Sequence, residues 1–198
     1  SGGCLTSKHL DTPIDYENLV AAGSMMGSGG MVVMDETSCM VAISKFYLEF
    51  TCEESCGKCS PCRIGNKRML EILDKITKGN GTMQDLQELR NLAGVIKDTA
   101  LCGLGQTSPN PVLSTLDNFW DEYVEHVVDK KCRAGVCKSL MSYEIDPAKC
   151  IGCGACARVC PQTAISGEKK MAHHIDNLKC IKCGACIEKC KFGAISIK

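Results

Sequence analysis

The strongest constraint on this chain is a 30-residue internal repeat that is dense in cysteine. "IDPAKCIGCGACARVCPQTAIS" at residues 145–166 aligns without a gap with "IDNLKCIKCGACIEKCKFGAIS" at residues 175–196, and each copy contains the run C-x2-C-x2-C-x3-C. Cysteines so closely spaced on a tight loop can turn their sulfurs toward one metal centre, and they are poorly placed to bridge distant strands. The repeat therefore predicts two similar metal-binding halves in one small domain.

This pattern resembles the bacterial ferredoxins with two [4Fe–4S] clusters, over about residues 141–198. In that family the first three cysteines of a run bind one cluster and the fourth binds the other. The resemblance implies two ligand sets: Cys150, Cys153, Cys156 and Cys190 for one cluster, and Cys180, Cys183, Cys186 and Cys160 for the second. Pro161 follows the first run as in the family, whereas Lys191 stands there in the second and removes no ligand. Two zinc knuckles are the alternative interpretation.

The overall composition bears on compartment and partners. The 17 cysteines among 198 residues are an odd number at short spacings, which favours a reduced, metal-rich cytoplasmic protein over a disulfide scaffold. Residues 1–130 carry 11 basic and 18 acidic side chains, and residues 131–198 carry 12 and 5. We interpret the basic part as a solvated surface around anionic clusters, and expect no nucleic-acid partner. We also expect no membrane span, because no apolar run is long enough.

A second group of cysteines lies among segments with helical periodicity. Cys56, Cys59 and Cys62 stand two residues apart in "ESCGKCSPCRIG", and Cys102 follows in a glycine-rich loop. Apolar spacing predicts four helices with short connections, which favours a four-helix bundle, over residues 39–51, 63–78, 83–97 and 111–129. A capping pair is predicted before the third helix, at Thr82 and Asp85. The expected apolar residues include Val41, Phe46, Leu48 and Phe50 in the first helix, and Phe119, Trp120 and Tyr123 in the fourth.

"ESCGKCSPCR", followed about forty residues later by "LCGLGQTSPNPV", resembles the iron–sulfur bundle of the NADH-binding flavoprotein subunit of complex I. Relatives of that subunit occur in NAD(P)-linked hydrogenases and formate dehydrogenases. The resemblance covers about residues 1–120 and implies that Cys56, Cys59, Cys62 and Cys102 bind a [4Fe–4S] cluster beside a flavin. Ile64 stands where many relatives carry an acidic residue, a difference expected to alter the surroundings of the cluster and not to abolish it.

The N-terminal part, residues 1–35, resembles the end of the ubiquitin-like domain of that family and the strand that follows. "GSGGMVV" lacks the spacing of a nucleotide-binding loop, so we expect a turn before an apolar strand. The chain begins without methionine in what reads as mid-protein sequence. We therefore expect that it is part of something longer, with the FMN- and NAD(P)-binding domain upstream.

A flavoprotein-type bundle followed by a two-cluster ferredoxin resembles the beta subunit of electron-bifurcating, NAD(P)-linked [FeFe] hydrogenases. The implied fold class is mainly α plus α+β, with a helical-bundle domain over residues 36–125, a zinc-binding hinge over 126–140 and a ferredoxin domain over 141–198. The implied partners are a small [2Fe–2S] subunit, a catalytic subunit and soluble ferredoxin.

The implied function is transfer of single electrons through three [4Fe–4S] clusters, between a flavin site and ferredoxin or a hydrogenase subunit. We expect no catalytic residue in this part, whereas the parent complex would be an NAD(P)-linked oxidoreductase. The alternative is a regulatory or oxygen-sensing iron–sulfur protein without redox catalysis.

Five cysteines remain outside the three ligand sets: Cys4, Cys39, Cys52, Cys132 and Cys137. "EHVVDKKCRAGVC" brings two of them close to His126, and structural zinc takes four nitrogen or sulfur ligands in segments too short to form a core. We therefore predict a zinc site that comprises His126, Cys132, Cys137 and Cys39. Cys39 is the least constrained of the four, with Cys4 and Cys52 as alternatives.

Other interpretations of this stretch are ordinary buried thiols, a disulfide or a [2Fe–2S] centre. A disulfide is disfavoured in a reducing compartment. The plant-type [2Fe–2S] spacing needs a cysteine where Leu140 stands. Three further histidines have no assigned role and are expected at the surface: His9, His173 and His174.

Overall fold

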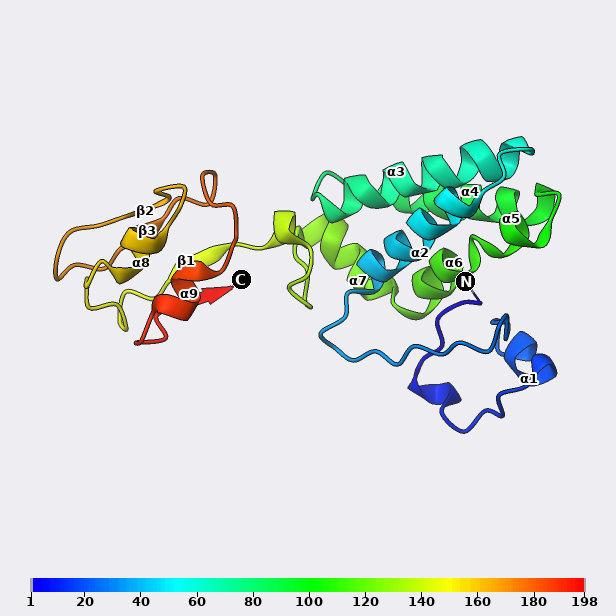
Figure 1. Ribbon diagram of the computed structural model, residues 1–198, viewed down its shortest axis with the longest axis horizontal. Coiled ribbons are helices and arrows are strands. Elements are labelled where there is room, and N and C mark those ends of the chain that lie inside the picture. The colour runs from blue at the N-terminus through cyan, green and yellow to red at the C-terminus, as the bar shows by residue number, and fades with distance from the viewer. Residues whose placement is uncertain (1, 198) are drawn as a thin grey trace. The chain divides into compact units, whose positions relative to one another are not determined.

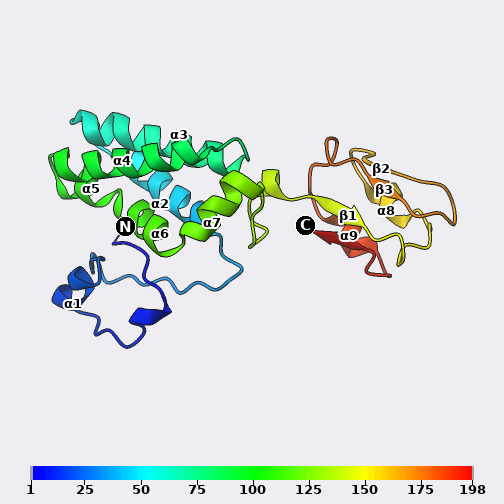
Figure 2. The same ribbon diagram turned by 180° about the vertical axis from the view of Figure 1, so that it is seen from behind.

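The computed structural model describes residues 2–197, so residues 1 and 198, at the ends of the predicted ranges, lie outside the described part. The chain divides into two compact units, with the boundary between Leu140 and Met141 (Figures 1 and 2). The first unit is helical, and the second contains short helices and two small two-stranded sheets. The described residues contain no helix that is long and apolar enough to span a membrane.

The core of the first unit lies among its longer helices, α2 (Met40–Glu54), α3 (Asn66–Thr77), α4 (Met83–Thr99) and α6 (Asn110–Asn118). Helix α2 packs against α3 and α6, and α4 packs against the same two helices (Figure 1). The shorter segments are η1 (Ser7–His9), α1 (Tyr16–Ala21), the π-helical turn η2 (Pro61–Gly65), α5 (Gly103–Thr107), α7 (Trp120–Val124), the π-helical turn η3 (Glu125–Asp129) and η4 (Lys138–Leu140).

The start of α4 confirms the predicted capping pair. The Thr82 hydroxyl accepts from the Asp85 backbone N–H, and the Asp85 carboxylate accepts from the Thr82 N–H at 2.7 Å. Two donors that helical bonds cannot reach are thereby satisfied. Lys75 on α3 donates to both oxygens of the same carboxylate at 2.8 Å, so the cap also ties α4 to its neighbour.

The helix predicted over 111–129 is broken, which corrects the sequence interpretation. Phe119 has φ −132° and ψ 36°, so α6 ends there and α7 begins in a new direction. The break places Tyr123 in the core, where its hydroxyl lies 3.0 Å from Ser44 Oγ and 2.8 Å from Thr115 Oγ1. Trp120, which had been expected on an apolar face, is 39% exposed. Local periodicity cannot reveal such a break, because the buried hydroxyl finds its partners on other helices.

Two of the apolar residues predicted for α2 are also misplaced. Phe46 and Phe50 are 60% and 51% exposed, because the helix turns only one face toward α3 and α6. That face carries polar as well as apolar side chains: Val41, Ser44, Leu48 and Thr51. The polar members bond within the core or to their own helix, so their burial is compensated.

The strand expected after the glycine-rich turn does not form. Residues 30–34 have no regular structure, and Val32 and Val33 are 64% and 83% exposed. A strand needs a neighbour for its backbone N–H and C=O groups. Within residues 2–197, none pairs with this segment.

The second unit interlocks the two copies of the repeat. Strand β1 (Tyr143–Ile145) pairs antiparallel with β4 (Ile195–Ile197), and β2 (Ile165–Ser166) pairs antiparallel with β3 (His174–Ile175). The start of each copy therefore lies against the end of the other. Helices α8 (Ala155–Val159) and α9 (Ala185–Lys189) carry the third cysteine of each run, and the core between the sheets is formed by Tyr143, Cys156, Ile165, Ile175, Cys186 and Ile195.

Candidate metal centres

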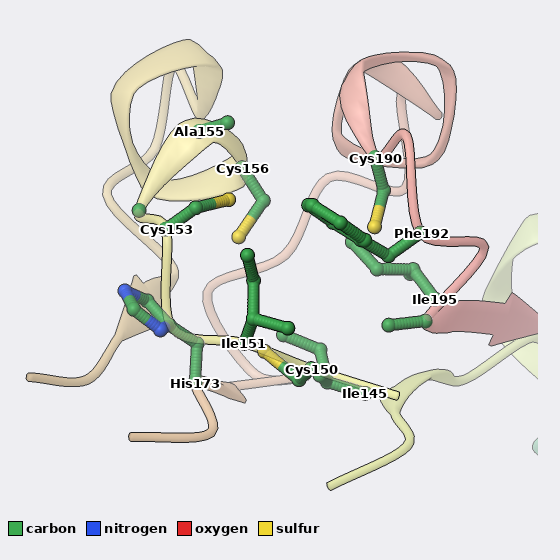
Figure 3. A pocket seen from close by; sticks show the side chains of 12 residues that line it. Ile145, Cys150, Ile151, Cys153, Ala155, Cys156, His173, Cys190, Phe192 and Ile195 are labelled. Atoms are coloured by element: carbon green, nitrogen blue, oxygen red, sulfur yellow. The ribbon is translucent and has the colours of Figure 1, made fainter. Parts of the chain in front are cut away.

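The second unit contains a pocket that four cysteines line together with apolar side chains (Figure 3). Cys156 projects from α8, and Cys190 projects from the end of α9 toward the same space. Ile145, Ile151 and Phe192 form part of the wall. The four cysteines are those of the first predicted set, three from one copy of the repeat and one from the other: Cys150, Cys153, Cys156 and Cys190.

A second pocket has the reciprocal lining. Its cysteines are again three from one copy and one from the other: Cys180, Cys183, Cys186 and Cys160. Apolar walls and backbone donors suit an anionic cluster, since the N–H of Ala164 lies 3.3 Å from Cys160 Sγ and that of Lys182 lies 3.4 Å from Cys180 Sγ. The fold thus brings the eight predicted cysteines into the two crossed sets.

The two cysteine loops differ at one backbone position. Gly152 and Lys182 occupy equivalent places in the repeat, and both have positive φ, 69° and 57°. A Cβ at Gly152 would lie 2.4 Å from the backbone nitrogen of Met171, so only glycine fits under the segment that covers the first loop.

The expectation for His173 was wrong. Its side chain is buried and lines the first pocket, with Nδ1 3.2 Å from the Met171 carbonyl oxygen. His174 is exposed, as predicted, and His9 is partly exposed. A single histidine gives no sign of burial in the sequence, because its burial depends on which side chains the fold places around the first pocket.

In the first unit, three of the four predicted cysteines, Cys59, Cys62 and Cys102, lie on or beside η2 and the start of α5. Cys62 is buried, and Cys102 is the N-cap of α5. Backbone N–H groups of Leu101 and Cys62 bond the Cys59 thiol and lower its pKa, which places the two loops side by side. A Cβ on Gly105 would lie 3.2 Å from Cys62 Cβ, so α5 packs closely on this cysteine. Cys56 is exposed on the preceding loop.

Three polar residues around Cys62 were missed by the sequence interpretation. Ser55 Oγ lies 3.2 Å and Asn66 Nδ2 lies 3.4 Å from Cys62 Sγ, and Ser108 Oγ lies 2.8 Å from Asn66 Oδ1. A polar residue at the core-facing start of a helix was the signal that could have identified Asn66.

A third kind of group forms where α2 begins. The ligand atoms of its four buried members all lie within 4.8 Å of one another, and the members are Cys39, His126, Cys132 and Cys137. Cys39 Sγ lies 3.3 Å from His126 Nε2 and 3.8 Å from Cys137 Sγ. These are the four residues grouped from the sequence. The alternatives lie elsewhere, Cys4 with its backbone on Ser114 and Cys52 on the far half of α2.

Local structure orients the side chain of each member of this group toward the others. Cys39 is the N-cap of α2, and its sulfur accepts from the Ala42 N–H. His126 Nδ1 lies 2.7 Å from the Glu122 carbonyl oxygen. Because a carbonyl can only accept, Nδ1 donates to it, and Nε2 is the ring nitrogen that faces Cys39. Cys132 and Cys137 follow a left-handed residue, Lys130, which ends η3 and reverses the chain.

The distances within the group fit a tetrahedral ion. Zinc–sulfur bonds of about 2.3 Å place two thiolates about 3.8 Å apart, which is the separation of Cys39 and Cys137. Although burial acts to lower it, hydrogen bonds to Cys132 and Cys39 raise the pKa of His126 to about 10. Hydrogen bonds from Cys137 and Cys39 lower the pKa of the Cys132 thiol. The lowered pKa favours the thiolate form of Cys132, which is the form that binds a metal.

A helical unit with a three-cysteine loop, joined to a unit with two crossed four-cysteine pockets, defines an iron–sulfur protein. Residues 42–126 match the family described as the NADH-ubiquinone oxidoreductase-F iron-sulfur binding region, and residues 142–191 match the 4Fe-4S dicluster domain. The chain belongs to the iron–sulfur proteins that carry these two regions.

The chain is 65% identical over 170 residues to the NADP-reducing hydrogenase subunit HndC of Solidesulfovibrio fructosivorans. The aligned residues cover 86% of this chain and 35% of that protein. The chain is 41% identical over 134 residues to an NADH-quinone oxidoreductase subunit of Streptomyces coelicolor, 68% of this chain and 30% of that one. The chain thus spans about a third of the length of these curated relatives. A crystal structure of an NAD+-reducing [NiFe]-hydrogenase in the H2-reduced state matches with a TM-score of 0.57 and 28% identity, over 64% of this chain and 21% of that chain.

Proposed function

We propose that this chain transfers single electrons through three [4Fe–4S] clusters inside a larger NAD(P)-linked oxidoreductase. Two clusters would be held by the crossed sets of the second unit. The third, here called the helical-unit cluster, would be held by Cys56, Cys59, Cys62 and Cys102, in the helical bundle inferred from the sequence. When bound, each cluster would accept and release one electron without needing an open coordination position.

The observation that carries this proposal is the crossed lining of the two pockets. Each pocket combines three cysteines of one run with the last cysteine of the other. Two isolated zinc knuckles would each draw on the four cysteines of a single run, so the crossing supports clusters that share the two copies. Apolar side chains line both pockets, and in the second pocket backbone N–H groups face the sulfurs of Cys160 and Cys180.

The names of the relatives suggest the ends of the electron path. A subunit of an NADP-reducing hydrogenase and a subunit of an NADH-quinone oxidoreductase both work with a pyridine nucleotide. We propose that FMN and NAD(P) are bound by regions of such a protein that these 198 residues do not span. The partners would be a small [2Fe–2S] subunit, a catalytic hydrogenase subunit and soluble ferredoxin.

We further propose that zinc occupies the group of Cys39, His126, Cys132 and Cys137 and fastens residues 126–140 to the start of α2. All four donors are nitrogen or sulfur, all are buried, and no water is needed to complete a tetrahedron. Residues 130–137 contain no helix or strand, so a metal would supply the stability that such a segment lacks.

Metal and sulfide analysis of the anaerobically purified chain tests these proposals, together with EPR during stepwise reduction. The expected result is about twelve irons and twelve sulfides, with one zinc, and three reducible [4Fe–4S] signals. A measured content of about eight irons would contradict one of the three proposed clusters. A content of about twelve irons with no zinc would contradict the proposed zinc site. Reversible loss of oxygen-labile clusters, with no electron transfer to an external acceptor, would favour a sensor instead.

A further inference from the structure

A chain of buried polar groups ends on the sulfur of Cys62. Asn66 is fully buried and Ser108 is 2% exposed. Ser108 Oγ lies 2.8 Å from Asn66 Oδ1, and Asn66 Nδ2 lies 3.4 Å from Cys62 Sγ. Asn66 is the first residue of α3, and Ser108 follows the last residue of α5. These hydrogen bonds therefore connect the two elements on either side of the helical-unit cluster.

Chemistry fixes the direction of these hydrogen bonds. A cysteine sulfur bound to a metal can only accept, so the amide NH2 of Asn66 must face it. The amide oxygen then faces Ser108, whose one hydroxyl hydrogen is shared between this oxygen at 2.8 Å and the Gly105 carbonyl oxygen at 2.9 Å. Ser55 acts in the same sense, because its hydroxyl accepts from the Gly57 N–H at 3.3 Å and is left to donate to Cys62. The sulfur of Cys62 is therefore a common acceptor for two side-chain donors.

The position of Asn66 is costly unless these bonds are made. The other buried residues on the core face of α3 are mostly apolar: Met69, Ile72, Leu73 and Ile76. An amide buried without partners would destabilise the fold, whereas an aliphatic side chain of similar size would pack with no such cost. The buried amide occurs at the end of α3 nearest the cysteine loop. This position indicates that it serves to donate a hydrogen bond to the sulfur of Cys62.

We propose that Asn66, held in place by Ser108, raises the reduction potential of the helical-unit cluster. This inference rests on the proposed function, since it requires Cys62 to be a cluster ligand. Reduction adds one negative charge to the cluster and its thiolates, and a donor on a ligand sulfur stabilises the more negative form more strongly. Asn66 is thus a positioning residue that makes electron entry at this cluster easier.

The test is an EPR-monitored redox titration of the full chain with wild-type sequence and with Asn66→Leu. The equilibrium constant for reducing this cluster should fall roughly fivefold to tenfold, the amount expected for the loss of one hydrogen bond. At 59 mV per tenfold change this is a shift of about 40 to 60 mV to lower potential. One of three one-electron waves should move, and the two waves of the second unit should stay, which makes them internal controls.

Ser44→Ala is the matched control. Ser44 is as deeply buried as Asn66 and is also hydrogen-bonded. It lies on α2 eleven residues before the C-cap Ser55, a helical rise of about 16 Å. It should leave all three waves in place. Asn66→Leu with twelve irons and an unmoved wave would overturn this inference alone. A wild-type chain with about eight irons and no response of iron content to Cys62→Ser would overturn the proposed function.

Ser108→Ala decides the matter if Asn66→Leu does not fold. It keeps the amide but removes the hydroxyl that holds it, so the same wave should shift in the same direction by a smaller amount. An unmoved wave in Ser108→Ala, or a shift of equal size in Ser44→Ala, contradicts the proposal.

Discussion

The Sγ atom of Cys39 lies 3.3 Å from Nε2 of His126, although the two residues are 87 positions apart in the chain. This contact joins the start of α2 to the π-helical turn that follows α7. It also places Cys132 and Cys137 opposite the same two side chains. Four donors from two distant segments are thereby concentrated in one buried place, which is the arrangement that a structural ion stabilises.

Cys132→Ser should therefore remove zinc and leave the iron content unchanged. Loss of a structural metal costs on the order of several kcal/mol, so the unfolding midpoint of the chain should fall by roughly 6 to 12 °C. Metal analysis and thermal unfolding followed by circular dichroism measure the two effects. Cys52→Ser serves as the control, because Cys52 is only partly buried and lies outside the group. Retention of zinc in Cys132→Ser would contradict the site.

The crossed pockets predict that replacing the last cysteine of one run disturbs the cluster bound mainly by the other run. Cys160→Ser should disturb the cluster proposed to be held also by Cys180, Cys183 and Cys186. Cys190→Ser should disturb the one proposed to be held also by Cys150, Cys153 and Cys156. Replacing one ligand usually converts or empties that cluster alone, because the other cluster keeps its four thiolates. Double variants show the pairing. Cys160→Ser with Cys183→Ser should lose about four irons, whereas Cys160→Ser with Cys153→Ser should affect about eight.

Gly105→Ala should weaken the helical-unit cluster through packing. The added methyl group would lie 2.6 Å from Ala100 Cβ and 3.2 Å from Cys62 Cβ, so either α5 or the cysteine must move. Overpacking of this kind costs about 1 to 3 kcal/mol, and the iron content should fall toward that of a chain with two clusters. Gly103→Ala is the control on the same helix, because no heavy atom lies within 4 Å of its added Cβ. Equal iron loss in both variants would count against a specific contact at Cys62.

Asp85→Asn should destabilise the first unit by about 1 to 2 kcal/mol at pH 7, because it weakens the cap of α4 and the pair with Lys75. Burial acts to raise the pKa of Asp85, but hydrogen bonds from Lys75 and Thr82 outweigh it and hold that pKa below its ordinary value. A lowered carboxyl pKa gives stabilisation that is complete above the ordinary pKa and is lost only as the pH falls through the lowered one.

The difference in unfolding free energy between wild type and Asp85→Asn should thus stay constant from pH 8 to 5. Urea denaturation measures it, with the exposed Asp98→Asn in the same helix as control. A difference that shrinks between pH 8 and 5 would mean that the carboxylate titrates in that range and is not held by Lys75 and Thr82.

Much of the fold follows from local rules. Periodicity and capping predict a helix over 83–97, and α4 spans Met83–Thr99, since a helix begins where a side chain satisfies its free N–H groups. The cysteine runs are local as well: three sulfurs spaced by two residues share a loop whatever surrounds it. The break at Phe119 and the exposure of Phe46 and Phe50 are not local, because they depend on which face of each helix meets a neighbour.

The sequence by itself determined the kinds of donor available and which of them share a loop. Cys56, Cys59 and Cys62, or Cys150, Cys153 and Cys156, stay close because few bonds separate them. Only the tertiary structure decided how distant donors combine. The pairing of β1 with β4 brings Cys190 to the first pocket, and the packing of α2 on α7 brings Cys39 to His126. Such contacts depend on the burial of side chains along whole helices and strands, which no short motif records.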